Sequence, residues 1–391
     1  MNRFLFNLEE VLYSLFIINL SMPKITEQGV TLNIASIKKD PHKKMPIFYN
    51  PVMKSNRNIS ILLLNSISNT KMHVALPLTG SGIRALRFLR ELKKGKIDTI
   101  FVNDKKADFV NTFTQALTTN NLKKTNSVKI CNDDANHFLL NQHTDDFCGY
   151  FDYIDIDPFG TPNPFLSASV SQVKRNGILA ITATDTAALT GTYPRSTKRK
   201  YWATSLKSYM MHETGLRTLI RKVQLQGIQF DKALTPILSY HKDHYFRIYF
   251  KQESGKERCD EIIKQHKYML YCPSCLNHTT SHFNKETCSC GTQFLFIGPL
   301  WIGKLFDTKL ITTMAKNNPF PEEQKFLDVL KEESKKDIVG FYDLHVIEKK
   351  YKFPIGKMDS VLKKLKAVRT HFSLTGIKTN INIKEIIRLL K

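Results

Sequence analysis

The chain has 391 residues, of which 42% are hydrophobic, as in ordinary soluble globular proteins. A chain of this length is long for one hydrophobic core, so we expect two or three domains. Lysine and arginine number 58 against 35 aspartates and glutamates, which gives a formal net charge of +23. This charge favours a polyanionic partner, first of all nucleic acid, although a lysine-rich bias in composition would also produce it.

The cysteines argue against a disulfide-stabilised secreted domain. Their number, seven, is odd, and four of them lie between positions 272 and 290. Such clustering favours a metal site and a reducing, cytoplasmic compartment.

The N-terminal stretch resembles neither a membrane span nor a complete signal peptide. Its longest apolar run, residues 11–20, is too short to cross a bilayer and follows Glu9 and Glu10. No small-residue cleavage site comes after it. We therefore expect residues 1–21 to be an extension outside the fold, with Met22 as the true start, and we expect no membrane association.

From Met72 onward, short apolar runs alternate with amphipathic stretches. Helices are predicted over 82–94 and 106–120, where apolar residues recur at helical spacing. Strands are predicted at five apolar runs: 72–78, 98–104, 127–133, 150–157 and 177–185. Strands separated by helices predict a parallel, doubly wound α/β sheet. Residues 237–250 are expected to add a strand pair with a polar turn at His241–His244, which closes the sheet in antiparallel fashion.

The rest of the chain divides at two polar segments. "KQESGKERCDE" (251–261) indicates a domain boundary, and "NPFPEEQKF" (318–326) indicates a second linker. The cysteine-rich segment lies between them. A lysine-rich tail follows, in which 342–351 and 356–368 are predicted to form two helices joined by a short turn. This pattern is winged-helix-like, and its lysines suit an RNA backbone.

The ends of the first three predicted strands carry the features of a nucleotide-binding edge. The first strand ends in "LTGSGIRA", a G-x-G-x-x-A turn at Gly80, Gly82 and Ala85. Asp104 ends the second strand, and Asp133 and Asp134 follow the third. Each acid could equally cap a helix, but three acid-bearing strand ends in succession favour a ligand. A pocket lined by acids suits the sulfonium of S-adenosylmethionine better than the pyrophosphate of NAD.

The fourth strand runs into "DPFG" at residues 157–160. An exocyclic base amine is a weak nucleophile because its lone pair is delocalised into the ring. A carboxylate such as Asp157 can accept its N–H groups, and Phe159 offers a face on which the base can stack. An ordinary surface turn after a buried strand is the alternative, because D-P-x-G is common turn chemistry.

Several long motifs together resemble one family, the tRNA guanine-26 N2-dimethyltransferases. They are "FYNPVMKSNR" (48–57), "TGSGIRALRF" (79–88), "DIDPFGTP" (155–162), "TATDTAALTGTYP" (182–194) and "RTHFSLTGIKTN" (369–380). The resemblance runs from about Met22 to the C-terminus, and "MPKITEQGVTLNI" is similar to that family's usual opening.

The resemblance implies a class I methyltransferase that uses S-adenosylmethionine to place one or two methyl groups on guanine N2 in tRNA. With the boundary at 251–261, we expect a methyltransferase domain at 22–251 and a C-terminal RNA-binding domain at 252–391, with a zinc segment at 268–297 and a winged-helix-like part at 320–391. Beside the motif glycines Gly80 and Gly82, the resemblance implies cofactor contacts by Arg57, Arg84, Asp104 for the ribose, and Asp134 with Ala135 for the adenine, and it implies that Asp157 and Phe159 handle the guanine. The turn lacks the acid common in such folds, a gap that Asp155 could fill.

Four cysteines have the spacing C-x2-C-x12-C-x-C, at Cys272, Cys275, Cys288 and Cys290. Two close pairs of thiolates can close a tetrahedral, structural zinc site. The second pair is one residue shorter than the usual C-x2-C, and His278 and His282 lie near enough in sequence to replace a ligand. Four free buried cysteines are the alternative.

A basic, aromatic segment, "YPRSTKRKYW" (193–202), follows the fifth strand and suits phosphate contact and base stacking, although a solvated helix start would look the same. We expect tRNA as the partner and no obligate protein partner. The competing interpretations are an rRNA guanine-N2 or DNA amino methyltransferase, and a non-catalytic RNA-binding protein with a decayed pocket.

Overall fold

The computed structural model describes residues 24–33, 49–122, 127–144 and 147–391. The predicted extension at 1–21 and the Met22 start lie outside these ranges. Within them, no helix combines the length and the apolar character needed to cross a membrane.

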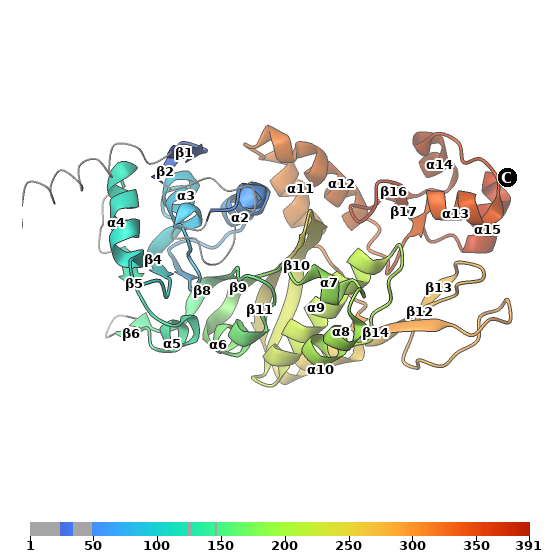
Figure 1. The fold of residues 1–391 in the computed structure, drawn as a ribbon, viewed down its shortest axis with the longest axis horizontal. Helices are drawn as coiled ribbons and strands as arrows, with labels where there is room; N and C mark the ends of the chain where they lie inside the picture. The colour runs from blue at the N-terminus through green and yellow to red at the C-terminus, as the bar shows by residue number, and fades with distance from the viewer. Residues whose placement is uncertain (1–23, 34–48, 123–126, 145–146) are drawn as a thin grey trace, which may run out of the picture.

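A seven-stranded sheet in the order β10-β11-β9-β8-β3-β4-β5 forms the centre of the protein (Figure 1). The parallel strands are β3 (Met72–Leu76), β4 (Ile97–Asn103), β5 (Val128–Cys131), β8 (Phe151–Ile156) and β9 (Val173–Ala183). β11 (Tyr245–Ser254) is antiparallel to β9, and β10 (Lys232–Lys242) is antiparallel to β11. The five predicted strands and the closing antiparallel pair are confirmed.

The strand order reverses between β3 and β8. From β3 the chain moves outward to β4 and β5, and then returns to β8 on the other side of β3. In open α/β sheets, ligands bind at the carboxyl ends of the strands beside such a switch point. The predicted glycine turn follows β3, and the predicted "DPFG" turn follows β8, so the two lie next to each other at this edge.

Helices cover both faces of the sheet (Figure 1). One face carries α2 (Lys54–Ser66), α3 (Ile83–Glu91) and α4 (Phe109–Thr119), and the other carries α5 (Ala135–Leu140), α6 (Leu166–Gln172) and α9 (Met211–Ile228). After β9 come α7 (Thr186–Leu189) and the basic α8 (Pro194–Tyr201). The central strands β3 and β8 are almost entirely buried, as parallel strands covered on both faces must be.

An N-terminal hairpin that we had not predicted fastens onto this frame. β1 (Lys24–Glu27) pairs with β2 (Val30–Asn33) through a Gln28–Gly29 turn in which both residues have positive φ. Glu27 is 3% exposed and pairs with Arg57 on α2 and Arg87 on α3. Burial alone would raise the pKa of Glu27, but these two guanidiniums lower it to about 2.

The C-terminal half contains two small sheets at the end of the molecule opposite α4 (Figure 1). The first, in the order β13-β12-β14, consists of β12 (His266–Tyr271), β13 (His278–Ser281) and β14 (Leu295–Trp301) and carries the cysteine loops. The second, β15-β17-β16, consists of β15 (Tyr342–Asp343), β16 (Val368–Arg369) and β17 (Gly376–Lys378).

The tail has the element order of a winged helix. α12 (Gln324–Ser334), β15, α13 (Leu344–Tyr351), α14 (Met358–Lys364), β16 and β17 run helix, strand, helix, helix, strand, strand, and α15 (Ile383–Leu390) ends the chain. The two helices predicted in 342–351 and 356–368 are confirmed.

Both segments predicted to be linkers are ordered parts of the fold. β11 continues to Ser254, and α10 (Lys256–Lys264) begins two residues later, so residues 251–261 are strand and helix. In the second segment, Glu323 is 2% exposed and accepts hydrogen bonds from Ser55, Asn58 and Lys242. Polar residues in these segments make tertiary contacts. Because such residues are also common in linkers, the composition of the two segments resembled that of linkers. The domain division at residue 251 stays a prediction.

A buried polar cluster joins α9 to the winged-helix-like part. Glu213 on α9 accepts from Arg217, from Lys378 on β17 and from the amide of Gly340. Glu333 on α12 accepts from Thr370 and the His371 amide. The segment "RTHFSLTGIKTN" therefore contacts α9 and α12, and Lys378, 1% exposed, does not face an RNA backbone.

Stacked histidines lie at the same junction. The rings of His212 and His241 lie 3.9 Å apart at 10°, and Nε2 of His371 accepts from the backbone N–H of His241 at 3.3 Å. Burial, together with His212, His371 and His244 nearby, lowers the pKa of His241 to about 3. The folded state therefore favours neutral His241.

We expect acid to weaken this junction. An unfolded histidine has a pKa of about 6.5, so the contribution of His241 to stability is complete above that pH and is lost as the pH falls toward 3, at up to about 1.4 kcal/mol per pH unit. Urea unfolding between pH 7 and 4.5 should give a shallower loss of stability for His241→Gln than for the unaltered chain. Equal slopes would show that His241 ionises freely in the fold.

Candidate active site at the carboxyl ends of β3, β4, β5 and β8

The turn after β3 depends on its two glycines. Gly80 and Gly82 have φ values of 60° and 82°, which favour glycine, and Gly82 begins α3. A Cβ on Gly82 would lie 2.4 Å from the ring of Phe113 on α4. The backbone N–H of Gly80 donates to Asp104 Oδ2 at 2.8 Å. Asp104 thus closes the turn from the end of β4, and the structure brings these two predicted residues together.

The predicted acids after β5 are partly committed to local structure. Asp134 caps α5, because its Oδ1 accepts from the N–H groups of Asn136 at 2.9 Å and His137 at 3.5 Å. Asp133 Oδ2 bonds the ring of His137. Helix capping, which was the alternative for these residues, is present here. Because Asp134 is exposed and Ala135 follows it on the first turn of α5, capping leaves their predicted contact with adenine as a prediction.

The "DPFG" turn is cross-braced to the loop after β9. The N–H of Gly160 donates to Thr184 Oγ1 at 2.7 Å, and the N–H of Thr184 donates to the Gly160 carbonyl at 2.9 Å. Pro158 is buried, whereas Phe159 is 51% exposed and the Asp157 side chain is 22% exposed. The turn therefore presents a carboxylate and an aromatic ring at the ligand-binding edge.

Arg84 connects the glycine turn to the "DPFG" turn. Its Nη2 donates to Asp157 Oδ2 and to Asn56 Oδ1 at 2.9 Å, and its Nη1 donates to Ser60 Oγ at 2.9 Å. Arg84 and Asp157 were expected to serve the cofactor and the guanine separately, yet here they form an ion pair.

Asp155 lies beneath this pair, 3% exposed. Arg247 on β11 donates to both of its oxygens, at 2.9 and 2.7 Å, and Tyr153 donates to Oδ2 at 2.6 Å. Burial would raise the pKa of Asp155, but Arg247 and Arg84 outweigh it and lower that pKa to about 2. The suggestion that Asp155 supplies the acid missing from the glycine turn is wrong, because its carboxylate is enclosed in this network.

Arg57 also occupies an ion pair. Its Nε and Nη2 donate to the two oxygens of Glu27 at 2.7 and 2.5 Å, and Nη2 also donates to the Asn50 carbonyl. Arg57 is 4% exposed, on the first turns of α2. A cofactor contact by Arg57 stays a prediction.

The basic segment forms helix α8 and is attached to the "DPFG" loop. Asn163 Nδ2 donates to the Lys200 carbonyl at 2.8 Å, and the Tyr201 hydroxyl donates to Thr161 Oγ1 at 3.1 Å and to Asp185 Oδ2 at 3.2 Å. Tyr193, Arg195, Lys198 and Arg199 are exposed on this helix or just before it. Exposed cations and an aromatic ring therefore stand next to the candidate site.

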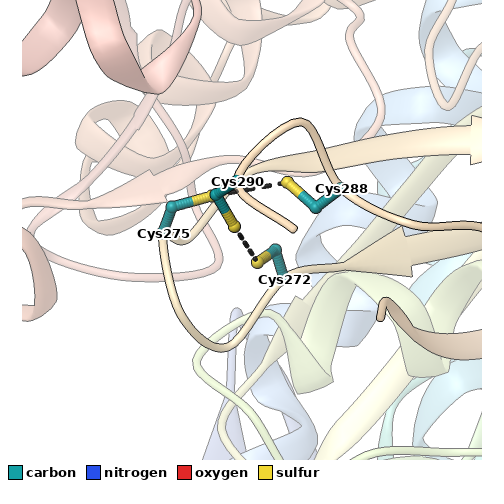
Figure 2. Close-up of side chains that lie close together, drawn as sticks. All are labelled: Cys272, Cys275, Cys288 and Cys290. Atoms are coloured by element: carbon teal, nitrogen blue, oxygen red, sulfur yellow. Dashed lines mark hydrogen bonds between the residues drawn. The ribbon is translucent and has the colours of Figure 1, made fainter. Parts of the chain in front are cut away.

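The four predicted cysteines come together from the loops before β13 and β14 (Figure 2). Their sulfurs all lie within 4.8 Å of one another, and Cys272 and Cys290, like Cys275 and Cys288, are 3.5 Å apart. His278 is outside this set and packs against Tyr342 instead. A zinc ion bound at about 2.3 Å by four thiolates separates the sulfurs by about 3.8 Å, which matches this arrangement.

A surface cavity of about 860 Å³ lies elsewhere, between β10, α10 and the end of β14. Glu257, Glu261 and Trp301 are among its lining residues, and none of the predicted site residues is. The candidate active site is thus defined by convergent strand ends, not by this cavity.

Comparisons with known proteins agree with this geometry. A family model described as "N2,N2-dimethylguanosine tRNA methyltransferase" matches residues 27–391. A tRNA (guanine(26)-N(2)/guanine(27)-N(2))-dimethyltransferase of Aquifex aeolicus is 37% identical over 383 residues, which cover 94% of this chain and 96% of that protein. This chain belongs to the N2,N2-dimethylguanosine tRNA methyltransferase family. A tRNA (guanine(26)-N(2))-dimethyltransferase of Methanothermobacter thermautotrophicus is also similar, at 34% identity over 94% of this chain and 98% of that protein.

A solved structure supports the fold of the family member. Trm1 from Pyrococcus horikoshii in complex with S-adenosyl-L-methionine matches with a TM-score of 0.81 and 30% identity, over 95% of this chain and all of that chain. The predicted family and the Rossmann-like methyltransferase fold are confirmed.

Sequence reasoning missed several residues of the site. Asn56 and Ser60 lie one turn apart on α2 and hold Arg84, but nothing in their local pattern distinguishes them from surface residues. Arg247 had a usable signal, because it is a lone cation within the apolar strand "YFRIYF". A charge at a buried strand position requires a buried partner, which here is Asp155.

We expect Gly82→Ala to destabilise the protein more than Gly95→Ala. Both glycines have nearly equal positive φ, 82° and 81°, but a Cβ on Gly95 meets no atom within 4 Å. Gly95→Ala should cost only the left-handed strain of about 1–2 kcal/mol, whereas Gly82→Ala adds an overpacking cost of about 1–3 kcal/mol against Phe113. Thermal unfolding of both variants measures the difference. Equal shifts would mean that α4 yields freely at Phe113.

Proposed function

We propose that this chain transfers one or two methyl groups from S-adenosylmethionine to the exocyclic N2 of guanine at tRNA position 26. The observation that carries the proposal is the position of Asp157 and Phe159, at the end of β8 beside the glycine turn, in a chain of this family. The Aquifex aeolicus relative is named for positions 26 and 27, so the position is part of what must be tested.

The cofactor is proposed to lie along the ends of β3, β4 and β5, where it supplies the electrophilic methyl group. Gly80 and Gly82, which lack side chains, are proposed to let the cofactor approach the backbone closely, and Asp104 is proposed to accept from its ribose hydroxyls. Asp134 and Ala135 are proposed to hold the adenine. Arg57 and Arg84 remain candidate contacts for its carboxylate end.

Asp157 is proposed to accept hydrogen bonds from the guanine amine. These bonds localise the nitrogen lone pair as the methyl group approaches, and Phe159 stacks on the base so that the amine is in line. The guanine must leave its stack within the tRNA to reach this turn. The exposed cations of α8 are proposed to bind the neighbouring phosphates, since α8 is hydrogen-bonded to the loop that carries Asp157.

The proposal is tested by incubating the purified protein with unmodified tRNA and labelled S-adenosylmethionine and then mapping the labelled nucleotide. We expect label on N2 of guanine 26 and none in a tRNA with adenine at that position. Asp157→Ala should nearly abolish transfer with little change in cofactor affinity, and Phe159→Ala should weaken tRNA capture by about 5- to 150-fold, the value of one stacking contact of roughly 1–3 kcal/mol. Label in ribosomal RNA or DNA instead, or near-normal transfer by Asp157→Ala, would contradict the proposal.

We also propose that the four cysteines hold one structural zinc ion. Four thiolates leave no position open for water, so the ion would stabilise the loops of the β13-β12-β14 sheet without taking part in catalysis. The matched control is Cys148→Ser, since Cys148 is exposed and outside the cluster.

Protein purified without chelators should contain about one zinc per chain by elemental analysis, and Cys272→Ser should lose it, because zinc binding and local folding are coupled. Chelation should lower the melting temperature of the unaltered chain but not that of Cys272→Ser. Full zinc content in Cys272→Ser would remove the site from these four residues.

A further inference from the structure

Protein groups enclose most of Arg84. The residue is 8% exposed, and its two terminal nitrogens bond Ser60, Asn56 and Asp157. Ser60 and Asn56 are themselves fully buried on α2, and the Ser60 hydroxyl lies 2.8 Å from the Tyr249 hydroxyl on β11. The guanidinium is therefore fixed in direction by neutral acceptors on one side and points at Asp157 on the other.

The ion pair between Asp155 and Arg247 keeps Arg84 from pairing with Asp155 in place of Asp157. Arg84 Nη1 lies 3.5 Å from Asp155 Oδ2, close enough for attraction. Asp155, however, already receives a two-fold bond from Arg247, which also donates to Thr182 Oγ1 at 2.8 Å. The two arginines and two aspartates balance in charge, so Arg247 satisfies the inner carboxylate and leaves Arg84 for the outer one.

The outer carboxylate is held at one oxygen only. Arg84 bonds Asp157 Oδ2, while Oδ1 makes no hydrogen bond to any residue within the described ranges. The Asp157 side chain is the member of the four that reaches solvent, at 22% exposure against 9% for Arg84. Because Arg84 holds Oδ2 of the Asp157 carboxylate, the orientation of Oδ1 is restricted as well.

We propose that Arg84 is a positioning residue for methyl transfer: it holds Asp157 by Oδ2 so that Oδ1 accepts the guanine amine. This rests on the proposed role of Asp157. The planar fork of arginine serves Ser60, Asn56 and Asp157 at once, which a lysine ammonium, as a point charge, cannot do in the same geometry. Losing this alignment should slow the methyl-transfer step itself, even at saturating cofactor, where a contact of Arg84 with the cofactor carboxylate no longer limits the rate.

The test compares Arg84→Lys with the unaltered chain in single-turnover methylation of tRNA at saturating cofactor. Arg84→Lys keeps the buried charge balance and should lower the transfer rate by about 100-fold, the cost of a misplacement of about 1 Å, while the tRNA dissociation constant changes less than about threefold. Saturating cofactor removes any contribution from weaker cofactor binding. Arg90→Lys is the matched control, because Arg90 is exposed on the same helix and, among the described residues, donates to the Asn120 carbonyl alone.

A double-mutant cycle identifies the route of the effect. In an Asp157→Asn background the ion pair is already lost, so Arg84→Lys should cost less than about threefold more. Equal penalties in both backgrounds would overturn the proposal, as would a wild-type transfer rate with weakened cofactor binding, which would make Arg84 a cofactor contact alone. If Arg84→Lys does not fold, Asn56→Ala removes the second acceptor of Nη2 without moving a charge and should show the same coupling to Asp157 at about tenfold.

The role of Asp157 and the positioning role of Arg84 can be tested separately. A near-normal rate for Asp157→Asn alone would remove the role of Asp157, whatever Arg84 does. Normal thermal unfolding of Arg84→Lys, together with the slow transfer rate, excludes a general loss of structure.

Discussion

The buried ion pair between Asp155 and Arg247 is the interaction on which the site depends. It joins β8, at the centre of the sheet, to β11, and Arg247 adds a bond to Thr182 on β9 and one to Ser60 on α2. Four elements thus meet at one charge pair just below the edge where ligands bind. Two charges brought out of water are costly unless they are paired and hydrogen-bonded, as both oxygens of Asp155 and both terminal nitrogens of Arg247 are here. Removing one partner leaves the other uncompensated at about 3–5 kcal/mol. The pair therefore fixes the strand ends more strictly than apolar packing would.

Buried carboxylates also join other segments that are distant in the sequence. Glu27 joins the N-terminal hairpin to α2 and α3, Glu323 joins the segment before α12 to α2 and β10, and Glu213 joins α9 to β17. In each case a buried carboxylate collects two or more donors from elements remote in sequence. Such contacts have strict geometry, so the winged-helix-like part and the strand ends are held in one frame. A tRNA that contacts both parts would then meet the active edge at a defined distance.

The hydrophobic periodicity of the sequence predicted the strands and helices of the sheet. The buried ion pairs and hydrogen bonds between distant residues could not be predicted in this way. Alternating apolar runs and helices predicted β3, β4, β5, β8 and β9 and the closing β10–β11 pair, because burial on both faces leaves its mark on consecutive residues. The strand-end positions of Asp104 and Asp157 followed from that order. The hairpin, α2 and the two supposed linkers did not follow, since Glu27, Glu323 and Asn56 read in sequence as ordinary surface residues. Their partners lie tens to hundreds of positions away in the sequence, and the neighbouring residues give no sign of these contacts.

The number of buried charged side chains shows where the excess positive charge of the protein lies. Among the described residues, eight basic and six acidic side chains are buried, so the interior holds only two of the excess positive charges. Most of the positive excess of the described residues therefore lies outside the buried interior. A surface of this kind attracts RNA over long distances but cannot choose a base. Discrimination must come from a small, rigid region that is close to neutral, and we propose that the balanced set of Arg84, Arg247, Asp155 and Asp157 is that region. On this proposal, long-range capture and short-range selection belong to separate parts of the chain, which meet where α8 is hydrogen-bonded to the loop after Asp157.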